Sequence, residues 1–65
     1  MTVSDLVSKC EAAKYRTDVI ARMIGYAVLI QRAGGIDNLN VSRATRFALS
    51  KNFRSLGVDP ETVVF

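Results

Sequence analysis

Hydrophobic residues recur at helical spacing along nearly the whole chain, and residues that interrupt helices fall at only a few positions. Ser4 is suited to cap a first helix, with Asp5 in the first turn, where a negative charge is favoured. This pattern predicts a first helix over residues 4–16. Its expected inward stripe is narrow and consists of Val3, Leu6, Cys10 and Ala13.

A second helix is predicted over residues 18–33, with an N-cap at Thr17 and Asp18. Gly34 and Gly35 mark its end, because glycine adopts the left-handed conformation that closes a helix. No glycine or proline separates this helix from the first, so one long bent helix over residues 4–32 is an alternative. At 100° per residue, its core face consists of Ile20, Met23, Ile24, Ala27 and Ile30.

A polar connection over residues 36–40 leads to a third helix, predicted over residues 41–56 with Asn40 or Ser42 as its N-cap. Gly57 follows this helix, and Val58 can pack back on Phe53, which is the pattern of a Schellman motif. The residues expected to face inward are Thr45, Leu49, Phe53 and Leu56.

The last residues of the chain have a different pattern. Asp59 and Pro60 can begin a short turn, since proline is tolerated at the first helical position. The β-branched pair Val63 and Val64 does not favour a long helix, and we expect residues 62–65 to dock on the core as an apolar tail. The whole pattern predicts one all-α domain over residues 1–65, with three helices and this short tail.

Composition limits how such a small domain can be stabilised. A chain of this size buries only about 60% of the surface that its unfolded form exposes, so its stability is marginal without further support. Cys10 is the only cysteine and the chain has no histidine, which excludes an intramolecular disulfide and makes a structural metal site unexpected. Helix packing and self-association are the remaining sources of stability.

The same composition indicates a soluble protein of a reducing compartment. Hydrophobic residues make up 49% of the chain, which is typical of a globular protein. The longest uncharged apolar run, residues 23–30, is far shorter than the roughly 20 residues of a membrane-spanning helix. The N-terminal segment mixes polar and charged residues and does not resemble a signal peptide. We therefore expect a cytoplasmic protein without a membrane span.

No combination of residues suggests catalysis. The chain has no histidine, and its six acidic residues are scattered singly, so no acid and base pair can be drawn. Cys10 lies on the apolar stripe of the first helix and is expected to be a buried, inert thiol. We expect a protein that is not an enzyme and that has no cofactor, metal or small-molecule substrate.

The second helix is apolar on almost all sides, and two other short helices cannot easily cover it. Leu29 lies opposite its core face, and Ala21 and Gly25 are small residues four positions apart, a spacing that permits close approach of another helix. This pattern predicts a homo-oligomer interface. The residues expected to form it are Ala21, Arg22, Gly25, Tyr26, Val28 and Leu29. A single exposed leucine on an otherwise covered helix is the alternative.

The third helix concentrates the positive charge of the chain, which is +3 in total. Residues 40–56 contain four basic side chains and no acidic one, and Phe47 stands on the same outward side as most of the cations. Basic side chains around an aromatic ring are typical of nucleic-acid interfaces. The candidate nucleic-acid residues are Arg43, Arg46, Phe47, Ser50, Lys51 and Arg54. The alternative is a solvated helix face, with Phe47 packed under the first helix or the tail.

Two functional hypotheses follow from these surfaces. The first is a non-enzymatic interaction protein that self-associates through its second helix and acts on protein partners as a scaffold, adaptor or regulator. The second is a dimeric nucleic-acid-binding regulator that reads DNA with its third helix.

Overall fold

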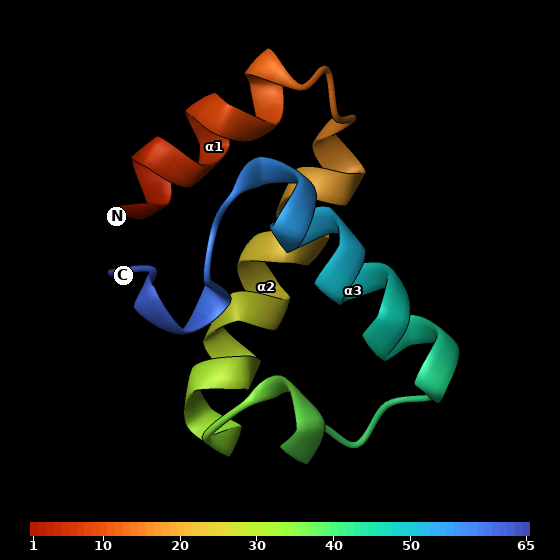
Figure 1. Cartoon of the computed structure of the whole chain (residues 1–65). Helices are drawn as coiled ribbons and strands as arrows, with labels where there is room; N and C mark the ends of the chain where they lie inside the picture. Colours follow the sequence, from red (N-terminus) through yellow and green to blue (C-terminus); the bar gives the residue numbers. More distant parts are fainter.

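Three α-helices and two short 3-10 turns make up the chain, and a computed structural model describes all of residues 1–65. The all-α prediction is confirmed. Helix α2 runs through the middle of the molecule, α1 crosses one end of it, and α3 lies along one side (Figure 1). In chain order the elements are α1 (Val3–Ala12), α2 (Thr17–Ala33), η1 (Ile36–Asn38), α3 (Arg43–Leu56) and η2 (Pro60–Thr62).

Helix α1 begins and ends earlier than the sequence pattern predicts. Its N-cap is Thr2 and not Ser4, because Asp5 then occupies the third helical position and completes a capping box. The backbone N–H of Asp5 donates to the Thr2 hydroxyl at 3.2 Å, and the backbone N–H of Thr2 donates to the Asp5 carboxylate at 3.1 Å. The hydrogen bond from the Thr2 backbone is the largest cause of a lowered pKa of the Asp5 carboxyl, and the bond with the Thr2 side chain lowers this pKa further.

Helices α1 and α2 are separate, so the alternative of one long bent helix is wrong. Helix α1 ends at Ala12 and not near Arg16, because Lys14 adopts a left-handed backbone conformation with φ of 62°. Ala13 therefore lies beyond the helix and is exposed, contrary to its predicted place on the inward stripe. Helix α2 begins at Thr17, so the prediction of Thr17 as its N-cap is wrong. The N-cap is Arg16, which provides no side-chain hydrogen bond.

The C-terminal ends of α2 and α3 are as the sequence predicts, whereas α3 begins at Arg43 and not at residue 41, because Ser42 is its N-cap. Gly34 and Gly57 both have positive φ, and each is followed by the hydrogen bond of a Schellman motif. Gly35 N–H donates to the Ile30 carbonyl at 3.0 Å, and Val58 N–H donates to the Phe53 carbonyl at 3.0 Å. Of the two candidate caps of α3, Ser42 is the observed one, and its hydroxyl accepts from the backbone N–H of Thr45 at 3.2 Å.

The core joins all three helices to the C-terminal segment. Helix α2 contributes the most to it, through the face predicted from its periodicity, with Ile20 and Ile24 half-buried at the margin. Cys10 has no exposed surface, so its prediction as a buried thiol is confirmed, and burial raises its pKa, to which the nearby Glu11 carboxylate adds. The central cluster consists of Leu6, Cys10, Met23, Ala27, Ile30, Phe53, Val58 and Val63.

The two ends of the chain lie side by side (Figure 1). Val64 N–H donates to the Met1 carbonyl at 2.7 Å, and Val3 N–H donates to the Val64 carbonyl at 3.2 Å. The predicted docking of the tail holds for Val63, which is buried. The side chain of Val64 is 61% exposed, since successive side chains of an extended segment point in opposite directions and Val63 faces the core. Phe65 is 56% exposed, so its side chain does not dock on the core as predicted.

Candidate functional site

The exposed face of α2 carries the residues predicted to form an oligomer interface. Leu29 is 50% exposed and Val28 is also exposed, although both side chains are large and apolar. Ala21, Arg22 and Gly25 are exposed as well. The structure therefore places these predicted residues on one solvent-accessible stretch of the helix.

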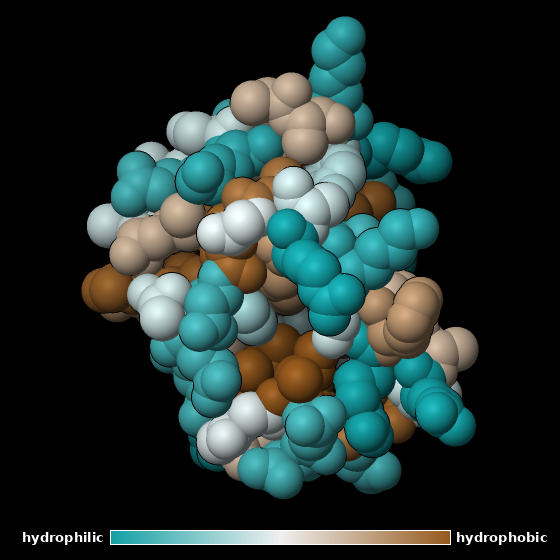
Figure 2. Space-filling model, in the orientation of Figure 1, coloured by the Kyte–Doolittle hydropathy of each residue, from teal (hydrophilic) through white to brown (hydrophobic).

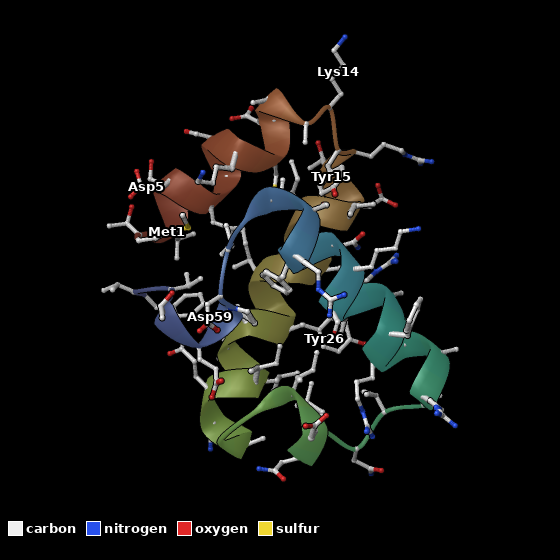
Figure 3. The ribbon with its side chains drawn as sticks, viewed as in Figure 1. Met1, Asp5, Lys14, Tyr15, Tyr26 and Asp59 are labelled. Atoms are coloured by element: carbon white, nitrogen blue, oxygen red, sulfur yellow. The ribbon has the colours of Figure 1, made fainter.

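Gly25 lies at the centre of this face and has open space above it. A Cβ atom built at Gly25 would have no other atom of the chain within 4 Å. A shallow apolar depression of about 240 Å³ lies here, lined by Arg22, Gly25, Tyr26 and Leu29. Tyr26 is half-buried and projects from α2 toward the side on which α3 lies (Figure 3). The geometry leaves room for a side chain or a helix backbone from another molecule.

The outer face of α3 presents an aromatic ring among free cations. Phe47 is 72% exposed, which excludes its packing under α1 or the tail. Arg43 and Lys51 lie one turn before and one turn after it, and Arg54 lies a further turn along the same side. All three cations are exposed and none of them is in an ion pair. We call Arg43, Phe47, Lys51 and Arg54 the cationic face.

Two of the predicted nucleic-acid residues do not belong to this face. Arg46 is half-buried beside η1, where its guanidinium lies 3.9 Å from the Asp37 carboxylate. Its Nε atom is buried without a hydrogen-bond partner. Ser50 is also half-buried and lines a groove on the flank of the helix. Both residues are less exposed than the four residues of the cationic face.

This groove was not predicted from the sequence. Its volume is about 420 Å³, and its apolar floor is formed by Ile30, Ile36, Phe53 and Val58. Figure 2 shows hydrophobic atoms at the bottom of a hollow on this side, surrounded by hydrophilic side chains. The charged residues that line it are Arg54, Asp59 and Glu61. Its walls come from α2, η1, α3 and the segment after Gly57, which only the folded chain brings together.

The residues that could bind a metal or act as a nucleophile are dispersed or buried. No three His, Cys, Asp or Glu side chains lie close enough to share a metal ion. The one cysteine is buried in the core, and burial raises its pKa, which disfavours the reactive thiolate. None of the helices has the length and apolar character that crossing a lipid bilayer requires.

The surface thus has three notable features: the depression at Gly25, the cationic face of α3, and the groove lined by α2, η1, α3 and the segment after Gly57. Comparison of the chain with models of known protein families, with curated proteins and with solved structures found no match.

Proposed function

We propose that this protein is a non-enzymatic interaction protein that self-associates through the exposed face of α2 around Gly25. Its role is then that of a scaffold, adaptor or regulator, in which pairing of two copies presents their remaining surfaces to protein partners. The observation that carries the proposal is the position of Gly25, at the middle of the longest helix with nothing of its own chain above it.

Glycine has no evident role at this position within one copy. A glycine in a helix interior is less favourable than alanine by about 1 kcal/mol, because it gains more freedom when the chain unfolds. Gly25 does not have the positive φ that requires glycine, and it makes no close approach within its own chain. A helix backbone from a second copy would need the space that a side chain here would fill.

The residues around Gly25 suit a contact between proteins. Leu29 and Val28 offer exposed apolar surface one turn away, and Tyr26 forms a wall of the depression. Aromatic residues and arginine are enriched at protein interfaces, and Arg22 also lines the depression, one turn before Tyr26. Covering this face would also add buried apolar area to a domain whose size makes its own core small.

The substitution Gly25→Ala tests the proposal because it acts in opposite directions on one copy and on a pair. Within one copy the methyl group meets nothing and favours the helix, so we expect stability at high dilution to rise by about 0.5 to 1 kcal/mol. Between two copies the methyl group obstructs the contact, so we expect the dissociation constant of self-association to increase by about tenfold or more.

Thermal denaturation at low concentration measures the first effect, and analytical ultracentrifugation over a range of concentrations measures the second. Ser8→Ala is the matched control, since Ser8 is exposed on α1 away from the depression and its substitution changes no charge. A Gly25→Ala protein that associates as tightly as the wild type would contradict the proposed position of the interface.

A further inference from the structure

We infer that the cationic face of α3 binds double-stranded DNA in the major groove. This inference does not depend on pairing through α2, because it uses a different helix and different residues. It rests on three properties of α3: its unpaired charge, its exposed aromatic ring and its convex shape.

The charge of α3 is not neutralised within the chain. The helix contains four basic residues and no acidic one, and only Arg46 has an ion-pair partner. The other exposed ion pair of the molecule joins Arg16 and Asp18 on α2. A strong positive charge along one side of a helix is complementary to a polyanion, and displacement of counterions from phosphates provides the driving force.

Phe47 identifies the kind of polyanion. Its ring is the most exposed of the large hydrophobic side chains, and it stands between Arg43 and Lys51. Exposure of this apolar surface does not stabilise the folded chain, and a partner that offered phosphates alone would leave the ring uncovered. DNA offers both phosphates for the cations and, in the major groove, base edges and thymine methyl groups for the ring.

The shape of α3 favours a duplex over a single strand. Its exposed side also carries the small residues Ala44 and Ala48, which permit close approach. An α-helix with its side chains is about 10–12 Å across, and the major groove of B-DNA is about 12 Å wide. Single strands are held in positively charged grooves. The large groove of this protein instead has two acidic residues, Asp59 and Glu61, in its lining.

The position of Phe47 near the beginning of α3 agrees with insertion of this helix into the major groove. Recognition helices contact base edges mainly with their N-terminal residues. Arg43 is the first residue of α3, and Phe47 lies one turn later. Helix N-termini also favour negative charge, so this end of α3 can approach a phosphate.

Fluorescence anisotropy with a labelled DNA duplex of random sequence tests the inference. We expect binding whose affinity falls between about 50 and 200 mM salt, with a slope near 0.9 per phosphate contact in a plot of log affinity against log salt. Arg43→Ala should flatten this slope by about one unit. Lys9→Ala removes the same charge from α1 and is the matched control, with a smaller change of slope expected.

Phe47→Ala separates the role of the ring from that of the charges. We expect it to weaken binding about tenfold without changing the slope, since it neutralises no phosphate. Phe65→Ala removes a similarly exposed ring outside α3 and should leave the affinity unchanged. Because Phe47 is exposed, Phe47→Ala should keep the wild-type thermal midpoint, which excludes loss of binding through unfolding.

Three outcomes would overturn the inference: no binding of the duplex at the lowest salt, equal losses in the α3 variants and their controls, or tighter binding of a labelled single strand than of the duplex. Leu29→Glu distinguishes this failure from that of the proposed self-association. The Leu29→Glu variant should lose pairing through α2 and still bind the duplex. Adding Arg43→Ala to this variant should flatten the slope of log affinity against log salt, as it does in the wild type.

Discussion

The side-chain amide of Gln31 donates a hydrogen bond to the carbonyl oxygen of Val63 at 2.6 Å and thereby attaches the end of the chain to α2. The same nitrogen lies 3.1 Å from the carbonyl oxygen of Pro60. Gln31 thus holds η2 and the residue Val63, whose side chain belongs to the core cluster, in place against α2.

Gln31→Glu should therefore destabilise the domain. The glutamate has nearly the same shape, but its ionised carboxylate cannot donate and would face two carbonyl oxygens. Loss of the hydrogen-bond donor to the partly buried Val63 carbonyl oxygen corresponds to about 1 to 3 kcal/mol. Thermal denaturation followed by circular dichroism measures the effect, with Arg32→Gln as the control, since it changes the charge by the same one unit at the next position. Equal midpoints for Gln31→Glu and the wild type would show that Gln31 does not hold the tail.

The C-terminal cap of α3 gives a second prediction. Gly57 has φ of 67°, a conformation that is unfavourable for residues with a Cβ atom. Gly57→Ala should lower the free energy of unfolding by about 1 kcal/mol. The added Cβ would meet no neighbouring atom, so the expected loss comes from the backbone alone. A neutral effect on chemical denaturation would be inconsistent with the left-handed conformation of Gly57.

The buried thiol of Cys10 should make stability depend on pH in alkaline solution. Burial raises its pKa above the ordinary value of 9.0, so the folded chain keeps a proton that the unfolded chain releases. The stabilisation of the folded state that results from this difference in pKa is complete below pH 9.0. It is lost as the pH rises through the higher pKa of the folded state.

Urea denaturation at increasing pH measures this loss. Cys10→Ala lacks the titrating group and serves as the comparison, although the cavity lowers its stability at every pH. Its stability should decline less steeply above pH 9.0 than that of the wild type. If the free energies of unfolding of the two proteins decline in parallel, the thiol does not contribute to the pH dependence of stability.

The parts of the fold that the sequence predicted correctly depend on local signals. Ser42 caps the beginning of α3, and Gly57 and Val58 form the Schellman motif at its end. Both signals lie within a few residues of the helix end that they define. The periodicity of apolar residues defined the core face of α2, because burial of one face depends only on helix geometry. The same geometry placed Phe47 on the outward side of α3 but left open its packing under α1 or the tail, and the structure decides between these alternatives, with Phe47 72% exposed.

The incorrect predictions concern features that depend on competition or on distant contacts. Thr2 and Ser4 are both good caps, and the bonds between Thr2 and Asp5 decide between them. Lys14 ends α1 in a conformation for which lysine gives no signal. The position of Arg46 depends on where the η1 turn brings Asp37, and the groove beside it depends on the path of the chain after Gly57.

Sedimentation velocity of the wild type and Leu29→Glu over a wide concentration range tests the proposed self-association most directly. Leu29 is 50% exposed, so the variant should fold, as circular dichroism can verify, while its charge would be buried in the interface. Val64→Glu places the same charge on another exposed apolar residue and should behave as the wild type. We predict that the wild type and Val64→Glu sediment increasingly as dimers or larger assemblies toward high micromolar concentration, whereas Leu29→Glu remains a monomer. A monomeric wild type throughout this range, or association of Leu29→Glu equal to that of the wild type, would contradict the proposal.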